Sequence, residues 1–261
     1  MRRYLRLWRI FLAHSLIQDL EYRWNWWMNA FHTLLSLGSS ALVLLVVFTQ
    51  RDAIGGWSFD QALTLLGVYL LIEGITVVFL VPNLNRVPQY VRRGELDYLL
   101  LKPIAARFIV STRYASVWWV PQLGLALAVI AWGMARQGTA TLAHAAALAV
   151  MLAAAIAILY AVWFALTTTA FWFVKVDNVS ELFTAFFAAG RFPIGAYPGW
   201  VRALLTFVVP VAFLTTVPAE AAAGTLTWGW ALGALAAAVL LLTLSQVLWR
   251  HALASYTSAS S

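Results

Sequence analysis

The sequence predicts an all-α polytopic membrane protein with six transmembrane helices. Of its 261 residues, 63% are hydrophobic and 10% are charged, and the mean hydropathy is +0.82. Soluble domains are about 45–50% apolar and about 25% charged, whereas several apolar runs here reach the roughly 20 residues that a spanning helix needs. Most of the 14 tryptophans lie near the ends of these runs, where the membrane–water interfaces are expected.

Charge and cysteine content exclude several classes of function. The net charge of +7 is distributed over the segments between apolar runs, so it indicates orientation in a lipid membrane and not nucleic-acid binding. The chain has no cysteine, which excludes disulfides, thiolate catalysis and thiolate metal sites.

Residues 1–24 are expected to form an interfacial helix in front of the first span. Arg2, Arg6 and Arg9 lie on one side of such a helix, and apolar residues lie on the other. A signal peptide is disfavoured, because the arginines interrupt the apolar run and no small-residue cleavage site follows.

Hydropathy predicts six spans, and the whole chain is expected to be a single domain. The fourth span is unusually long: as one helix it would extend about 50 Å, against a hydrocarbon core of about 30 Å, so it must tilt or project from the bilayer. The spans are 26–48, 59–81, 114–132, 142–174, 178–193 and 227–249.

Residues 197–224 are ambiguous, because prolines divide an apolar stretch that could otherwise form a seventh span. The distribution of basic residues argues against a seventh span. With six spans and both termini cytosolic, the inner side holds 13 of the 17 Lys and Arg residues. The region is therefore expected to enter the outer leaflet and return as a re-entrant hairpin, packed against protein.

The segment RRGELDYLLLKPIAAR, residues 92–107, lies in a loop (86–113) between the second and third spans. A charge buried in lipid costs about 2.5–3.5 kcal/mol even on lenient scales, so this segment must lie outside the membrane. Its apolar residues and the following Pro103 predict a short amphipathic helix that contacts a cytosolic partner. An ordinary solvated loop is the alternative.

These residues resemble the membrane subunits of ABC-2-type ABC transporters. The loop sequence RGELDYLLLKPI is similar to the G-x-L-(E/D)-x-L-L-x-x-P element of those permeases. The segments FPI, PGWVRAL and VP together resemble their outer hairpin. The N-terminal helix resembles their connecting helix. The chain departs from better-known members at Pro218, where many relatives continue a helix. It looks most like the subgroup with two dissimilar permeases and one ATPase, so the membrane part could be a homodimer or a heterodimer.

The resemblance implies a coupling helix that docks on an ABC ATPase subunit. Leu96, Leu99 and Leu100 are expected to enter an apolar groove of that partner, with charged residues at its rim. The implied ATPase-contacting residues are Gly94, Glu95, Leu96, Asp97, Tyr98, Leu99, Leu100, Lys102 and Pro103.

This chain is expected to be a non-catalytic permease without a cofactor of its own. It lacks the G-x-x-x-x-G-K-[ST] phosphate loop, so ATP and Mg²⁺ would bind to the partner. The resemblance further implies an exporter in the bacterial cytoplasmic (inner) membrane, in which two permeases form the substrate path.

Three residues within spans are candidates for that path: Glu73 in the second span, and Asn29 and His32 in the first. Ionisable and polar groups within a span are costly, so they are candidates for a functional role. For Glu73 the alternative is a hydrogen bond to a neighbour such as Thr64, Asn29 or Thr76. The identity of the substrate is left open.

Two other classes of function remain as alternatives. A secondary transporter would usually show an internal repeat, and none is evident. An intramembrane enzyme would need a catalytic motif such as H-E-x-x-H or G-x-S-x-G, and neither occurs. A permease-like assembly or sensor subunit would keep the fold without transport.

Overall fold

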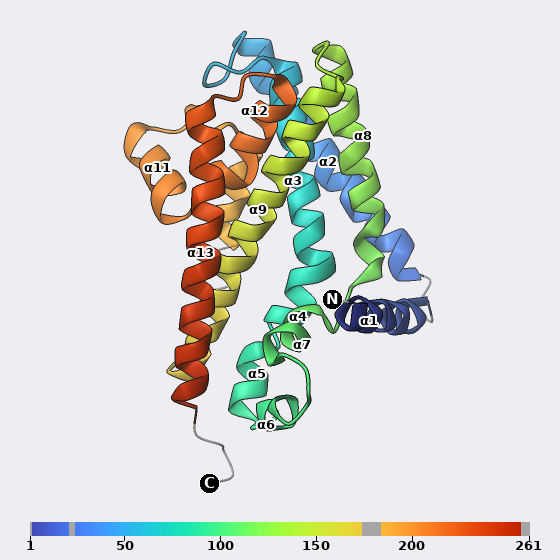
Figure 1. The fold of residues 1–261 in the computed structure, drawn as a ribbon. Coiled ribbons are helices and arrows are strands. Elements are labelled where there is room, and N and C mark those ends of the chain that lie inside the picture. The colour runs from blue at the N-terminus through green and yellow to red at the C-terminus, as the bar shows by residue number, and fades with distance from the viewer. Residues whose placement is uncertain (1, 21–23, 174–183, 257–261) are drawn as a thin grey trace.

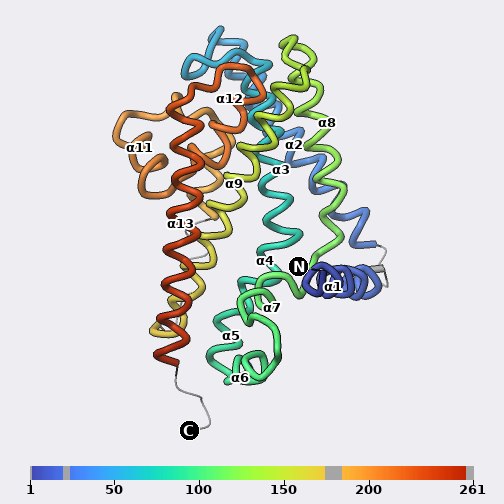
Figure 2. Tube along the Cα trace, viewed as in Figure 1, coloured from blue at the N-terminus to red at the C-terminus, as the bar shows by residue number. Residues whose placement is uncertain are grey.

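Long helices that run roughly side by side form the body of the protein in a computed structural model, which describes residues 2–20, 24–173 and 184–256 (Figures 1 and 2). Within these residues, five helical stretches are long and apolar enough to cross a membrane, or six if one bent pair counts as a span. The all-α membrane fold is therefore confirmed. The long helices are α2 (Trp24–Gln50), α3 (Phe59–Ile75), α8 (Val120–Arg136), α9 (Leu142–Thr168) and α13 (Trp228–Ala254).

Helix α3 is the central element of the bundle, and most of its side chains are buried. It packs on α8 through glycines that allow the two backbones to approach closely. A Cβ atom added at Gly67 would lie 2.9 Å from Ile130 Cγ1, and one added at Gly133 would lie 2.1 Å from Thr64 Oγ1. Larger residues at either glycine would therefore force the helices apart.

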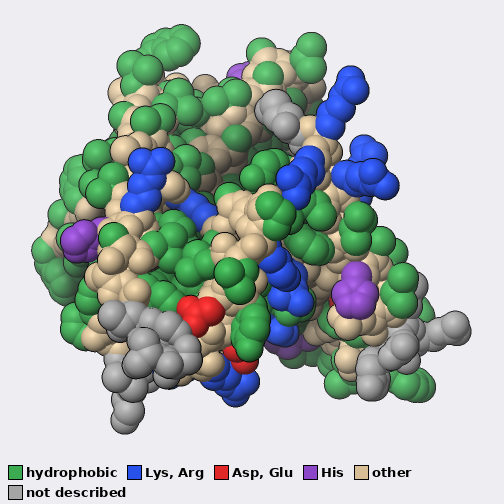
Figure 3. All heavy atoms as spheres, turned by 60° about the horizontal axis from the view of Figure 1, so that its bottom comes forward, with side chains coloured by type: hydrophobic (Ala, Val, Ile, Leu, Met, Phe, Trp, Pro, Cys, Tyr) green, Lys and Arg blue, Asp and Glu red, His purple; other side chains and the backbone are tan. Residues whose placement is uncertain are grey.

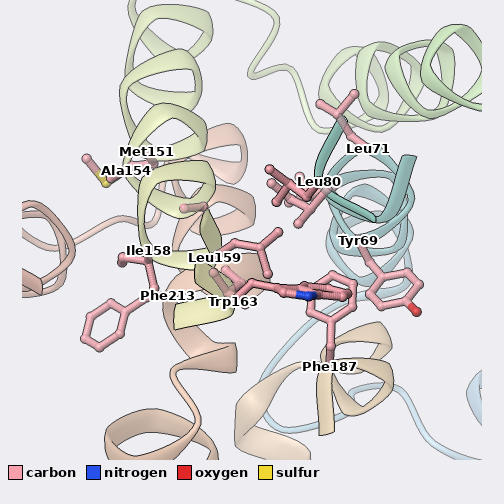
Figure 4. Packing of buried hydrophobic residues seen from close by; sticks show 14 of the residues in the cluster. Tyr69, Leu71, Leu80, Met151, Ala154, Ile158, Leu159, Trp163, Phe187 and Phe213 are labelled. Carbon is pink, nitrogen blue, oxygen red and sulfur yellow. The ribbon is translucent and has the colours of Figure 1, made fainter. Parts of the chain in front are cut away.

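The hydrophobic core continues from α3 to α9, α12 (Val217–Ala223) and α13. Figure 4 shows Leu159 and Trp163 directed from α9 toward the side of Tyr69 and Phe187. The rings of Tyr69 and Phe187 stack with centroids 5.0 Å apart, so the segment that contains Phe187 lies along α3.

Beyond Ile75 the chain continues as a π-helical turn, Thr76–Leu80, and then as α4 (Val81–Leu84). Pro82 has no N–H group, so it cannot donate the helical hydrogen bond to the Val78 carbonyl. The backbone N–H of Ser116 donates to that carbonyl instead, at 2.9 Å. The buried Asn83 side chain adds two hydrogen bonds to the backbone of Tyr114, so α4 is fixed to the start of the next long segment.

Three short helices follow at one end of the bundle, which we call the short-helix end: α5 (Val87–Arg92), α6 (Leu96–Leu100) and α7 (Ala106–Thr112). The N-terminal helix α1 (Arg2–Leu20) lies crosswise to the long helices near this end (Figure 1).

Helix α1 is attached by polar contacts to the segment that follows α7. Ser15 Oγ accepts from the Ala115 N–H at 3.1 Å, and Asp19 Oδ2 accepts from the Val117 N–H at 2.7 Å. Burial raises the pKa of the Asp19 carboxyl, although hydrogen bonds from Val117 and Trp118 oppose that shift. The helix expected within 1–24 is therefore present, with residues 1 and 21–23 outside the described part.

The opposite end holds a bent pair of helical segments, Gly199–Val208 and Ala212–Ala223, which meet at 77°. A turn of 3₁₀ helix (Ile194–Ala196) precedes them and contacts the α2–α3 turn, where Gly55 has a positive φ of +56°. A Cβ added at Gly55 would lie 2.5 Å from the Gly195 carbonyl carbon, so this is a backbone-to-backbone contact. The bent pair occupies the expected re-entrant region, 197–224, and its depth in a membrane stays a prediction.

Helix bounds differ from the expected spans mainly at the second, third and fifth. The second candidate span continues to Arg92, into the expected loop 86–113. The third begins at Val117 as a 3₁₀ turn, and α8 follows from Val120 with Pro121 in its first turn. Residues 178–183 of the expected fifth span, 178–193, lie outside the described residues. Its remainder is helical at 184–188, followed by η4 (Ala189–Arg191).

The chain must change ends between α9 and the 3₁₀ turn at Ile194–Ala196. Phe171, just after α9, packs edge-on against Trp249 near the end of α13, whereas Gly195 contacts the α2–α3 turn at the opposite end. Together with the five long helices, this change of ends gives an even number of passes along the bundle. Helix α1 and the last turn of α13 therefore lie toward the same end (Figure 1).

We expect Gly133→Ala to lower the unfolding temperature of the purified protein in detergent, because its methyl group would collide with Thr64. Overpacking of this kind costs about 1–3 kcal/mol. Gly124→Ala on the same helix is the matched control, since nothing lies within 4 Å of its added Cβ. Equal unfolding temperatures for the two variants would contradict the close α3–α8 packing.

Candidate functional site

The expected short helix at the coupling motif is α6. Gly94 adopts a left-handed conformation, φ +68°, which ends α5 and turns the chain into α6. The helix runs only from Leu96 to Leu100, and it ends before Pro103. A five-residue helix is not stable alone, so α6 depends on its packing.

Helix α6 has one buried face and one exposed face. Leu96 and Leu99 are 0% and 3% exposed and belong to the core of this chain. Tyr98, Leu100 and Leu101 are 72%, 44% and 83% exposed. The expectation that Leu96 and Leu99 enter a partner's groove does not fit their burial, and the exposed residues are the ones free to contact a partner.

Charged side chains surround the exposed face of α6. Glu95 lies 3.8 Å from Arg93, and both side chains are largely exposed, so this ion pair contributes little to stability. Lys102 and Pro103 are also exposed. Figure 3, in which the short-helix end comes forward, shows Lys and Arg side chains spread over this face and few acidic ones.

Asp97 connects α6 to the C-terminal end of α13. Burial, and secondarily the nearby Asp97 carboxylate, raise the pKa of Tyr256. The ring of Tyr256 packs edge-on against Phe171, with centroids 5.6 Å apart. The end of α9 and the segment after α13 therefore meet next to α6.

Arg107 on α7 joins the short-helix end to two long helices. Its Nε donates to Tyr160 Oη of α9 at 3.1 Å, and its Nη2 donates to Ser245 Oγ of α13 at 2.9 Å. Its Nη1 also donates to Gln246 Oε1. The guanidinium carbon lies 4.4 Å from the centroid of the Phe164 ring, which adds a cation–π contact. From the sequence, Arg107 was only a basic residue of the loop.

A second polar cluster lies within the bundle around Glu73. Tyr69 Oη donates to Glu73 Oε1 at 2.9 Å, and Gln122 Nε2 donates to Glu73 Oε2 at 3.0 Å. Arg191 Nη2 lies 3.8 Å from Glu73 Oε1. These contacts distribute the carboxylate charge over three partners from α3, α8 and η4.

Glu73 does accept a hydrogen bond from a neighbouring helix, as the alternative predicted, but from Gln122 and not from Thr64 or Thr76. The Thr64 hydroxyl donates to the Asp60 carbonyl and the Thr76 hydroxyl to the Ile72 carbonyl. Tyr69 could have been found from its helical i, i+4 spacing to Glu73. Gln122 and Arg191 are distant in sequence, and only the fold brings them to the carboxylate.

A cavity of about 180 Å³ adjoins this cluster, and His32 and Glu73 both line it. His32 lies edge-on to Trp119 with ring centroids 5.6 Å apart. Asn29 does not line the cavity; its backbone carbonyl accepts from the Thr33 hydroxyl at 2.8 Å. The structure therefore brings together two of the three candidate path residues.

The described residues contain no group of three or more His, Asp and Glu side chains that could hold a metal ion.

Comparison with known protein families gives a match to a family described as "ABC-2 family transporter protein", over residues 34–260. Neither the curated proteins nor the solved structures include a match to the chain. The matched range covers most of the sequence, including the short-helix end and all five long helices except the start of α2.

The two faces of α6 predict different effects of truncation. Leu99→Ala removes buried side-chain volume and should destabilise the protein by about 2–5 kcal/mol. Leu101→Ala removes an exposed side chain and should change stability by less than about 0.5 kcal/mol. Thermal unfolding in the same detergent measures both, and a larger loss for Leu101→Ala would contradict the orientation of α6.

Proposed function

Because the chain belongs to the ABC-2 family of transporter proteins, we propose that it is the permease subunit of an exporter driven by a separate ATPase subunit. The family match is the observation that carries the permease assignment. The direction of transport, the ATPase contact and the partner permease are parts of the proposal. The protein would reside in the bacterial inner membrane, with both termini cytosolic.

The exposed face of α6 is proposed to dock on the ATPase. Tyr98, Leu100 and Leu101 present an apolar surface at the end of the bundle, and the charged Glu95 and Lys102 lie beside it. A central apolar patch with a charged rim is the usual anatomy of a protein interface. ATP and Mg²⁺ would bind to the partner, since this sequence has no phosphate loop.

Movement of α6 would be transmitted through three sets of contacts. Leu96 and Leu99 anchor α6 in the core, and Arg107 connects the adjoining α7 to α9 and α13. Asn83 connects α4 to the segment that leads into α8. Displacement of the short-helix end would therefore act on several long helices together.

The substrate path is proposed to lie between two permease subunits, near Glu73, His32 and Asn29. Helix α2 is the element best placed for this, because most of its side chains are exposed although it is strongly apolar. The second subunit could be another copy of this chain or a dissimilar permease, and the path would be completed by its residues.

We expect Leu101→Asp and Tyr98→Asp to abolish co-purification of an ATPase with this chain from its native membrane. A carboxylate there would be desolvated in the interface without a partner. Leu142→Asp is the matched control, because Leu142 is equally exposed at the opposite end of the bundle. Mass spectrometry of the purified material gives the readout. An ATPase retained by both α6 variants would refute the docking proposal.

We expect Arg107→Gln to uncouple ATP hydrolysis from helix movement in the assembled complex. The glutamine cannot reach α9 and α13 together, so the ATPase should still hydrolyse ATP while the long helices stop responding. Spin labels on cysteines introduced at the exposed Leu42 and Leu240 report the movement, and the cysteine-free chain makes this labelling specific.

Arg93→Gln is the control for the loss of positive charge in the same loop, since Arg93 is largely exposed. If Arg93→Gln and Arg107→Gln alter the ATP-dependent distance change equally, the transmission role assigned to Arg107 is wrong.

A further inference from the structure

A second groove, of about 340 Å³, lies between α2 and η4 next to the cavity at Glu73. Val43, Leu44 and Leu66 give it apolar walls, while Ser39, Ser40 and Arg191 supply polar groups. Arg191 lines both spaces, so its guanidinium forms the boundary between them.

The unsatisfied polar group of this region is a hydrogen-bond donor. Both carboxylate oxygens of Glu73 accept hydrogen bonds, and Gln122 Nε2 donates to Glu73 Oε2 and to the Leu70 carbonyl. Arg191 is different: its Nη2 is 3.8 Å from Glu73, which is too long for a hydrogen bond. Its Nε is buried and has no hydrogen-bond partner among the described residues.

The Arg191 guanidinium lies over the Tyr69 ring and 3.8 Å from Glu73, and its side chain is 36% exposed and lines the groove, so it can also pair with an acceptor that enters the groove. A guanidinium pairs best with a carboxylate or a phosphate, because its planar N–H groups can donate to two oxygens at once. The Ser40 hydroxyl adds a rotatable donor on the facing helix, whereas the Ser39 hydroxyl already donates to the Ser36 carbonyl at 3.0 Å. A cationic ligand would instead meet the like charge of Arg191.

We propose that this groove binds an anionic amphiphile, with its carboxylate or phosphate head at Arg191 and Ser40 and its apolar tail along Val43, Leu44 and Leu66. Ser40 lies near the middle of α2, so the head would be held far from both ends of that helix. The exposed side chains of α2 leave the groove open at the surface of this chain. Binding itself requires only this chain; identification of the ligand as transported cargo rests on the proposed function.

The test is native mass spectrometry of the purified chain in neutral detergent, titrated separately with dodecyl phosphate, dodecanoate and dodecyltrimethylammonium. We expect both anions to bind and the cation not to bind above the background of a neutral alkyl glycoside. Arg191→Gln should weaken binding of the anions about tenfold or more, since it removes the charge-assisted hydrogen bonds. Arg51→Gln, which removes a charge from the exposed end of α2, should change binding less than twofold.

Val43→Phe provides a test that keeps the charge cluster intact. Val43 is partly exposed, so the larger ring is compatible with folding but narrows the groove. It should weaken anion binding while the unfolding temperature is unchanged. Equal anion affinity in Arg191→Gln and Arg51→Gln, or stronger binding of the cation, would overturn the proposal.

A competition arm identifies the source of the ligand. Displacement of dodecyl phosphate by phosphatidylglycerol, and not by phosphatidylcholine, would support a bilayer lipid as the occupant. Displacement by dodecanoate alone would support a free single-chain amphiphile. Because neither arm involves the ATPase, failure of binding and failure of the exporter proposal give separate results.

Discussion

The structure depends on one constraint: most polar groups that are buried among apolar helices find their partners inside the chain. Pro82 leaves the Val78 carbonyl without its helical donor, and the Ser116 N–H replaces that donor. The Glu73 carboxylate is held by a tyrosine and an amide from two helices. Arg107 is held by neutral oxygens and aromatic faces of α9 and α13. Each of these sets of hydrogen bonds fixes the relative position of helices whose arrangement cannot be predicted from hydropathy.

The same constraint separates what the sequence predicts from what it does not. Long apolar runs predicted α2, α3, α8, α9 and α13 closely, because burying apolar residues in lipid requires only local composition and length. A short helix after Gly94 was also predictable from the glycine, the following leucines and Pro103. Which face of α6 is buried was not, because in a five-residue helix the neighbouring elements decide the orientation.

The polar sites show a similar division. Glu73 and His32 could be selected as candidates because such side chains are rare within spans, and they do line one cavity. Arg191 could not be selected from the sequence, since no local pattern relates it to Glu73. Its position depends on the passage of the chain back along α3, where Phe187 stacks on Tyr69. Contacts between residues distant in sequence carry the chemistry here, and they follow from the fold.

The contact between Gly55 and Gly195 has a mechanical consequence. Two backbones touch there with no side chain between them, and each glycine lies too close to the other turn to accept a Cβ atom. Such a contact cannot be compressed, and it lacks the flexible side chains that could adjust to sliding. The α2–α3 turn and the 3₁₀ turn before the bent pair therefore cannot approach each other further. A tilt of α2 and α3 toward the bent pair would be stopped at this contact, so it limits the direction in which the two helices can move.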